Sequence, residues 1–258
     1  MIILAVYNIK GGVGKTAGAV NLSYQAAGEG SKTLVCDLDP QSAATFYFRV
    51  VPKVKKGRSA FLENPKAMID SVKETDYENL DLLPADFSFR KLDLALHRRK
   101  HPRELLAQTL RAVGDDYDWV FLDCPPNLTL LAEHVFSCAD YILHPTIPTV
   151  LSLRTYKTLR TFFKRKGLSR DKLLPFFSMY EKRKKMHREL MAFMLQNYQR
   201  MLTTAIPYAS EIERMGIRRE PVGKTFPGGI AARAYETLWR EIKGRIERGG
   251  VPEPRSGL

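Results

Sequence analysis

The sequence contains little cysteine and no long hydrophobic run. Its three cysteines, Cys36, Cys124 and Cys138, cannot all pair, and two of them lie in apolar stretches typical of buried strands. This argues against a disulfide-stabilised secreted fold and favours a reducing, cytoplasmic location. No stretch approaches the roughly 20 apolar residues that a membrane span requires, so we expect a soluble protein that is not anchored in a membrane.

Acidic residues are also scarce, but only in the second half of the chain. Residues 1–150 carry 17 basic and 18 acidic side chains, whereas residues 151–258 carry 24 basic and 10 acidic side chains, a net charge of +14. The overall net charge of +13 therefore originates in the second half. Such a concentration indicates a polyanionic partner, either nucleic acid or an anionic membrane, and the alternative is a basic surface that only confers solubility.

Short apolar runs alternate with helical patterns along the whole chain. This alternation predicts an α/β fold, a doubly wound, mostly parallel sheet flanked by helices on both faces, in a single domain over residues 1–248 with a flexible tail at 249–258. The expected strands are Ile2–Asn8, Thr33–Asp37, Leu80–Leu83, Trp119–Asp123, Tyr141–His144, Leu173–Met179 and Thr203–Ile206. The expected helices cover residues 16–29, 88–97, 102–114, 128–138, 150–166, 184–198 and 228–248, and segments 49–60 and 180–188 are expected to be loops.

A glycine-rich loop follows the first expected strand and opens the first expected helix. It contains Lys-Gly-Gly-Val-Gly-Lys-Thr at residues 10–16. Glycines let backbone amides converge on phosphate oxygens, Lys15 can reach the β- and γ-phosphates, and the Thr16 hydroxyl can bind Mg²⁺. Ile9 occupies the first glycine position of the standard phosphate loop, and Lys10 adds a second lysine near its start. The loop predicts a nucleoside triphosphate site.

Aspartates close two of the apolar strands. Asp37 and Asp39 lie at the end of the second strand, and Asp123 closes the strand at residues 119–123. In enzymes with a phosphate loop, one such carboxylate holds the Mg²⁺ shell and another polar group positions the attacking water. Alone, each aspartate could equally be a turn or helix-capping residue. Together with the phosphate loop, and in this order, they are candidate site residues.

Three segments together resemble the ParA/MinD family of deviant-Walker ATPases, and the ParA branch in particular. They are residues 10–16, Asp-Leu-Asp-Pro-Gln at 37–41 and Leu-Asp-Cys-Pro-Pro at 122–126, and the resemblance extends over residues 1 to 245. It implies ATP and Mg²⁺ as cofactors and a face-to-face homodimer in the ATP state. It further implies that Lys10 of each subunit reaches the nucleotide of the other subunit.

The resemblance also assigns roles to the site residues. Lys15 would stabilise charge on the phosphate, Asp39 would orient or activate water, and Asp37 would support the metal shell or a switch. The absence of a hydroxyl at Ala17, where the family commonly has threonine, costs about 1 kcal/mol of nucleotide contact. The predicted catalytic residues are Lys10, Lys15 and Asp39, the metal-binding residues are Thr16, Asp37 and Asp123, and the nucleotide-binding residues are Lys10, Gly11, Gly12, Val13, Gly14, Lys15, Thr16, Ala17, Met179 and Pro207.

The helix expected at 150–166 has one basic face and no acidic residue. At about 100° per residue its five basic side chains fall within an arc of roughly 140°, opposite an apolar face that includes Leu151 and Tyr156. A merely solvated face usually mixes both signs of charge. We therefore predict that this helix binds the phosphates of double-stranded DNA without reading bases. The candidate residues are Arg154, Lys157, Arg160, Lys164 and Arg165, with Arg214, Arg218, Arg219, Arg240 and Lys243 as further candidates.

The predicted function is that of a dimerising, DNA-associated ATPase that positions or segregates a plasmid, chromosome or protein assembly. The resemblance implies a location on the nucleoid and release by a ParB-like or cargo-adaptor protein that stimulates hydrolysis. Glu211, however, stands about where the chromosomal ParA pattern has a DNA-contacting arginine. The alternative is an ATP-dependent ligase or an iron-sulfur reductase of the same superfamily. A reductase needs cysteines at a dimer interface, which the strand positions of Cys36 and Cys124 oppose.

Overall fold

A mixed but mostly parallel sheet forms the centre of the molecule. The computed structural model describes residues 1–51, 70–85, 106–107, 110 and 116–249, and within these ranges the sheet has eight strands in the order β3-β4-β2-β5-β1-β6-β7-β8. All neighbouring strands are parallel except β3 and β4. The strands are β1 (Ile2–Val6), β2 (Thr33–Asp37), β3 (Lys73–Glu74), β4 (Leu80–Leu83), β5 (Trp119–Asp123), β6 (Tyr141–Thr146), β7 (Leu173–Tyr180) and β8 (Ala205–Pro207).

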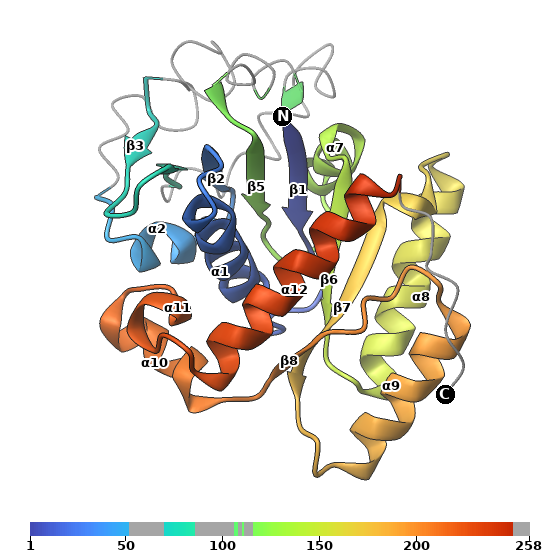
Figure 1. Ribbon diagram of the computed structural model, residues 1–258. Coiled ribbons are helices and arrows are strands. Elements are labelled where there is room, and N and C mark those ends of the chain that lie inside the picture. Colours follow the sequence, from blue (N-terminus) through green and yellow to red (C-terminus); the bar gives the residue numbers. More distant parts are fainter. Residues whose placement is uncertain (52–69, 86–105, 108–109, 111–115, 250–258) are drawn as a thin grey trace.

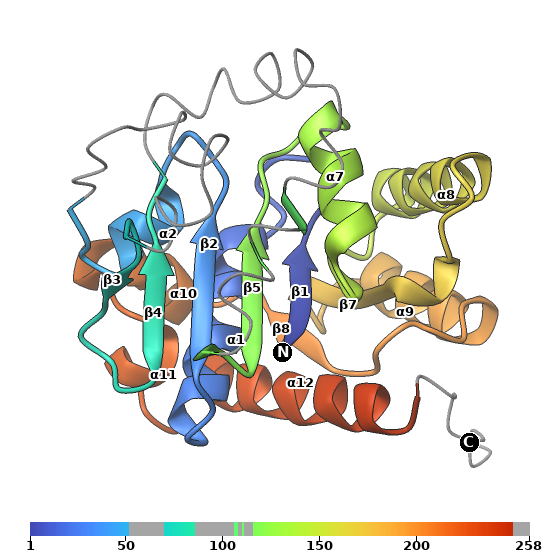
Figure 2. The ribbon, with the colours of Figure 1, turned by 90° about the horizontal axis from the view of Figure 1, so that it is seen from above.

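Helices cover both faces of this sheet, which confirms the predicted doubly wound fold (Figures 1 and 2). One face carries α1 (Lys15–Gly28), α2 (Ala43–Tyr47), α10 (Ser210–Arg218), α11 (Val222–Thr225) and α12 (Ile230–Glu247). The other carries α7 (Leu130–Cys138), α8 (Val150–Arg165) and α9 (Lys185–Asn197), with the short 3₁₀ helix η3 (Arg170–Lys172) between α8 and β7. No helix in the described ranges is long and apolar enough to cross a membrane.

Burial on both faces explains why the central strands are apolar without interruption. In β1, Ile3 and Ala5 belong to the core beneath α7 and α8, whereas Leu4 and Val6 belong to the core beneath α1 and α12. Successive side chains of a strand point to opposite faces, so a strand covered on both sides needs apolar residues at every position. All five residues of β2 are also buried: Leu34, Val35 and Cys36 are apolar, and the polar side chains of Thr33 and Asp37 at the two ends are hydrogen-bonded.

Most expected elements are present, and the differences have physical causes. β8 begins at Ala205 and not at Thr203, because the amides of Thr203 and Thr204 donate to the Glu241 carboxylate at 2.7 and 2.9 Å. β7 ends at Tyr180 and α9 begins at Lys185, so only residues 181–184 of the expected loop at 180–188 form a loop. The sequence patterns did not predict β3, α2, α10 or α11, which are short. The expected helix at 88–97, most of the helix at 102–114, most of the loop at 49–60 and residues 250–258 of the tail lie outside the described residues.

Glu211 has a structural role that the sequence did not indicate. Its Oε2 accepts a hydrogen bond from the Ala231 amide at 2.9 Å, in the first turn of α12. A Cβ added to Gly229, the residue before α12, would lie 2.9 Å from both carboxylate oxygens. A negative charge beside a helix N-terminus satisfies an unpaired amide and interacts favourably with the helix dipole. Glu211 therefore holds α10 against the start of α12.

We expect Glu211→Ala to lower the free energy of unfolding by about 1 kcal/mol, because it removes this cap. Urea-induced unfolding followed by circular dichroism measures the change. Glu213→Ala is the matched control, since Glu213 is exposed on the same helix and accepts a hydrogen bond from the Tyr208 hydroxyl, not from a helix N-terminus. Equal destabilisation by the two substitutions would show that Glu211 is not a specific cap.

Candidate functional site

The phosphate loop lies at the carboxyl edge of the sheet, between the end of β1 and the start of α1. Gly12 and Gly14 adopt φ angles of 67° and 88°, which other residues rarely adopt. A Cβ added to Gly14 would also lie 2.8 Å from the Ser178 hydroxyl of β7. Glycine is therefore required at Gly14 both by the backbone conformation and by the close approach of β7.

The start of α1 is arranged to receive an anion. Its first turn contains no acidic residue, and no side chain caps it through a hydrogen bond. The first amides of a helix have no acceptor within the helix and carry the positive end of its dipole. A phosphate group would satisfy these amides, as the sequence predicted.

Lys15 is a buried cation directed at the loop. Only 7% of its surface is exposed, and its Nζ donates to the Lys10 carbonyl oxygen at 3.0 Å. Burial lowers the pKa of Lys15, and the nearby Asp123 and Asp39 carboxylates oppose this shift. A buried ammonium group that bonds a neutral carbonyl gains a stronger partner when a phosphate enters the loop.

Asp123 is a fully buried carboxylate at the end of β5. It pairs in register with Val6 of β1 and with Asp37 of β2, so the ends of three strands meet beside the loop. Neither of its oxygens accepts a hydrogen bond from any described residue. Burial raises the pKa of Asp123 well above its ordinary value, and the neighbouring Asp37 raises it further, whereas the nearby Thr16 side chain lowers it.

This carboxylate fits a site for Mg²⁺. In the described part of the chain, no three His, Cys, Asp or Glu side chains cluster in a way that could hold a metal ion. Mg²⁺ commonly binds one or two protein groups and takes its remaining ligands from phosphates and water. Thr16 and Asp123 would therefore hold the ion or its water shell, and the cation would neutralise the charge of the orphaned carboxylate.

The two aspartates after β2 have different surroundings. Asp37 is buried, and its Oδ2 accepts hydrogen bonds from the amide and hydroxyl of Thr45 at 2.8 and 2.7 Å. Its Oδ1 accepts from the Asp39 amide at 3.2 Å, and burial raises the pKa of Asp37 to about 6. Asp39 is half-buried, and its Oδ1 accepts from the Gln41 amide at 2.9 Å. Asp37 thus ties β2 to α2 and supports the loop that presents Asp39.

The two residues predicted to contact adenine lie side by side. Met179 is at the end of β7 in the left-handed conformation, with φ of 52°, and the next residue, Tyr180, pairs with Pro207 at the end of β8. Ser178 lies beside Gly14, so this end of β7 approaches the phosphate loop. Ser178 and Thr45 were not predicted as site residues, because their partners are distant in sequence and no motif marks them.

The predicted DNA-binding residues divide between the two faces of the sheet. Those of α8 lie on the face that carries α7 and α9, whereas those on or next to α10 and α12 lie on the opposite face. The ten candidates therefore do not form one surface within a single chain.

Four of the five basic side chains of α8 are exposed. Arg154, Lys157, Lys164 and Arg165 make no ion pair with any residue that the structure describes. Arg160 is instead half-buried, with its guanidinium 5.0 Å from the centre of the Tyr198 ring. The placement of Leu151 on the packed face was wrong, because it is 62% exposed. It lies in the first turn of α8, beside the exposed Val150 and beyond the core.

Three of the five DNA-binding candidates on the other face already interact with side chains or carbonyls of the same chain. Arg240 pairs with Glu236, and Lys243 pairs with Glu29 and lies 5.8 Å from the centre of the Trp239 ring. Arg219 donates to the Phe46 carbonyl at 3.0 Å and stacks on that ring. Arg214 and Arg218 are exposed and make no ion pair with described residues.

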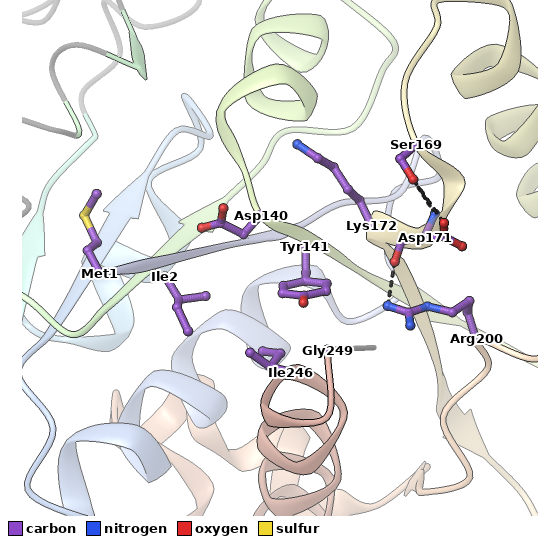
Figure 3. Close-up of a pocket in the computed structure, with 10 residues that line it drawn as sticks. All are labelled: Met1, Ile2, Asp140, Tyr141, Ser169, Asp171, Lys172, Arg200, Ile246 and Gly249. Atoms are coloured by element: carbon purple, nitrogen blue, oxygen red, sulfur yellow. Dashed lines mark hydrogen bonds between the residues drawn. The ribbon is translucent and has the colours of Figure 1, made fainter. Parts of the chain in front are cut away.

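A cavity of about 580 Å³ lies at the opposite edge of the sheet (Figure 3). It is lined by Ile2 and Tyr141 at the starts of β1 and β6, and by Lys172 and Arg200. Lys172 already donates to the Ala139 carbonyl at 2.7 Å, and Arg200 to the Asp171 carbonyl at 2.6 Å. Because the phosphate loop follows the carboxyl end of β1, this cavity is separate from the nucleotide site.

Comparisons with known proteins agree with the geometry of the loop. A family model described as an AAA domain matches residues 1–173. The chromosome-partitioning ATPase Soj of Treponema pallidum is 29% identical over 249 residues, covering 94% of this chain and 97% of that protein.

Two solved structures have the same fold. Cobyrinic acid a,c-diamide synthase from Mycobacterium smegmatis, with bound ATP analog and magnesium, is 25% identical with a TM-score of 0.78, covering 98% of each chain. The McdA–ATP complex of Cyanothece is 18% identical with a TM-score of 0.80, covering 94% of this chain and 96% of that one. ATP and Mg²⁺ are thus the cofactors that the fold and the phosphate loop accommodate.

We expect Asp123→Asn to stabilise the nucleotide-free protein at pH 8, because burial raises the pKa of this carboxyl group and the substitution removes its charge. Below a pH of about 4 the group is protonated in both the folded and the unfolded state, so it does not lower the free energy of unfolding. As the pH rises from there towards the raised pKa of the folded state, the unfolded state ionises first and the free energy of unfolding falls. The substitution should also abolish the additional stabilisation by ATP with Mg²⁺. Thermal unfolding at pH 4 and pH 8, with and without MgATP, measures both effects. Asp39→Asn is the control, and equal stability of all three proteins at pH 8 would contradict the prediction.

Proposed function

Since the chain belongs to the AAA domain family, and within it to the ParA/MinD-type P-loop ATPases, we propose that it hydrolyses ATP. It does so as a homodimer that binds DNA non-specifically and positions a cargo. The observation that carries this proposal is the combination of a phosphate loop with a helix, α8, whose four exposed cations make no ion pair with the residues that the structure describes. The cargo would be a plasmid, a chromosome or a protein assembly.

The dimer is supported by the surroundings of Lys10. Both backbone polar groups of Lys10 are hydrogen-bonded: its amide donates to the Asn8 side chain, and its carbonyl accepts from Lys15. Its side chain is half-exposed and makes no ion pair with the described residues. A second copy facing this edge would bring its nucleotide within reach of that ammonium group. A cation supplied in trans makes hydrolysis depend on dimerisation.

Exposed apolar side chains lie at the same edge. Val150 and Leu151 are 63% and 62% exposed at the start of α8, directly after β6. Leu128 follows Asn127, whose carbonyl accepts from the hydroxyl of Tyr7 just beyond β1. Burial of these side chains against a second copy would stabilise a face-to-face dimer.

The chemical roles follow from the positions of the side chains. Lys15 and the amides of the loop would bind the phosphates, with Thr16 and Asp123 at the metal. The metal would polarise the phosphoryl group and neutralise charge as it develops. Asp39 would orient the attacking water, since its carboxylate is half-buried at the mouth of the site. Met179 and Pro207 would border adenine.

We assign DNA binding to the face formed by α8 and α9. α9 packs beside α8, with the rings of Tyr156 and Tyr198 5.1 Å apart. Lys182 and Arg183, just before α9, are also exposed and without ion pairs among the described residues. Unpaired cations can exchange their counterions for DNA phosphates without breaking a salt bridge. On the opposite face, by contrast, Glu211 caps α12, and it stands about where the chromosomal ParA pattern has a DNA-contacting arginine.

The likeness to the chromosome-partitioning ATPase Soj supports a role in partitioning, which we place on the nucleoid in the cytoplasm. An adaptor protein of the ParB type, or one attached to the cargo, would stimulate hydrolysis and release the protein from DNA. The likeness to cobyrinic acid a,c-diamide synthase favours a ligase as the second candidate. A ligase would hydrolyse ATP only with its acceptor substrate and would bind DNA equally weakly in every nucleotide state. The reductase alternative is weakened, since Cys36 and Cys124 are buried.

Retention on non-specific DNA with ATP, with ADP and without nucleotide tests the proposal. We expect retention with ATP only. Lys10→Ala should abolish retention, because it removes the trans contact, whereas Asp39→Ala should bind DNA persistently and hydrolyse ATP at least tenfold more slowly, because the water is no longer oriented. Surface-immobilised DNA and phosphate release measure the two effects. Equal retention in all nucleotide states would refute the nucleotide-gated dimer.

The DNA surface is tested by a charge-matched pair of double variants. Arg154→Gln with Lys157→Gln should weaken DNA binding and reduce the slope of log K against log salt by about 2, because two phosphate contacts are lost. Arg214→Gln with Arg218→Gln removes the same charge from the opposite face and should have a much smaller effect. If both pairs reduce the slope equally, the assignment to α8 is wrong.

A further inference from the structure

Lys10 is held in place by a buried polar group that no sequence motif revealed. Asn8 and His144 are both fully buried, and β6 places His144 beside the start of the phosphate loop. The Asn8 Oδ1 accepts from the Lys10 amide at 2.9 Å. The Asn8 Nδ2 donates to the Pro145 carbonyl at 2.8 Å and lies 3.3 Å from Nε2 of His144.

The partners of His144 determine its tautomer. Its Nδ1 lies 2.8 Å from the Tyr7 carbonyl oxygen, which can only accept, so Nδ1 carries the proton. Nε2 is then unprotonated and accepts the second Nδ2 hydrogen of Asn8. Burial lowers the pKa of His144 to about 4, which keeps the ring neutral and this acceptor available at physiological pH. Every hydrogen-bonding group of the pair is satisfied.

The ring of His144 is also fixed from outside the loop. Tyr156 of α8 packs on it with a centroid distance of 5.5 Å and an interplanar angle of 33°. On the other side of Lys10, the Lys15 ammonium group bonds the Lys10 carbonyl. The amide and the carbonyl of Lys10 are therefore anchored separately, the amide through Asn8 and His144 and the carbonyl through Lys15.

We propose that Asn8 and His144 are positioning residues that hold the Lys10 backbone so that its side chain points out of the subunit towards a second copy. This proposal rests on the proposed trans role of Lys10. When a phosphate draws the Lys15 ammonium group away from the Lys10 carbonyl, the Asn8–His144 pair is the remaining anchor. It thus acts at the stage when the dimer forms.

Two substitutions separate the hydrogen bonds of His144. His144→Gln places an oxygen near the position of Nε2 and can still accept from Asn8. His144→Asn can reproduce the Nδ1 donor but cannot reach Asn8. We expect His144→Asn to lower the ATP turnover of the dimer roughly fivefold, the effect of about one lost hydrogen bond, and His144→Gln to retain most of it. The affinity of the monomer for a fluorescent ATP analogue should be unchanged in both. His134→Asn, at a buried histidine of α7, is the matched control for stability.

The decisive measurement combines His144→Asn with Lys10→Ala. If His144 acts through Lys10, the double variant should have the turnover of Lys10→Ala alone, because the side chain being positioned is absent. If the two losses multiply, or if His144→Asn weakens monomeric ATP binding as much as turnover, the positioning role is overturned. If Lys10→Ala alone leaves turnover unchanged, it is the proposed trans function that fails.

Discussion

The parallel pairing of β1 between β5 and β6 is the constraint on which the site depends. Parallel strands end at the same edge of a sheet, so this order brings the phosphate loop, Asp123 and His144 together although they come from three distant segments. β2 then joins β5 and adds Asp37 opposite Asp123. The chemistry at this edge is therefore a consequence of strand order, whereas the cavity at the opposite edge is lined by Lys172 and Arg200, which bond backbone carbonyls.

The site is electrostatically incomplete by itself. Lys15 is a buried cation bonded to a neutral carbonyl, and Asp123 is a buried carboxylate without a donor among the described residues. The two charges attract each other through space but make no ion pair within the described residues, and a buried charge without a hydrogen-bonded partner of opposite sign costs free energy. A nucleotide with Mg²⁺ would supply an anion for Lys15 and a cation for Asp123. Nucleotide binding would therefore offset the free-energy cost of burying these two charges. Stability and affinity are linked through the same two side chains.

The sequence predicted what local pattern and motif determine, and missed what tertiary contacts determine. β2 and β5 have their predicted bounds because each has a central apolar run, buried on both faces of the sheet, that closes on an aspartate. The loop at residues 10–16 was identifiable because its glycines and lysines are adjacent. The Asn8–His144 contact spans 136 residues, and Glu211 caps a helix that begins 19 residues later, so no local pattern marks either. Leu151 was misplaced because helical periodicity does not indicate where a helix extends beyond the core.

α8 contacts both the surroundings of the phosphate loop, which comes from the first half of the chain, and the basic surface of the second half. Its buried face carries Tyr156, which packs on His144 and so borders the polar group that anchors Lys10. Its exposed face carries the unpaired cations, and its first turn exposes Val150 and Leu151 at the edge where a second copy would dock. A rigid helix of 16 residues keeps these three surfaces in fixed relation. Any displacement of α8 on the proposed dimerisation would therefore move the basic face and the support of Lys10 together, and would couple the proposed DNA binding to the nucleotide state through one helix.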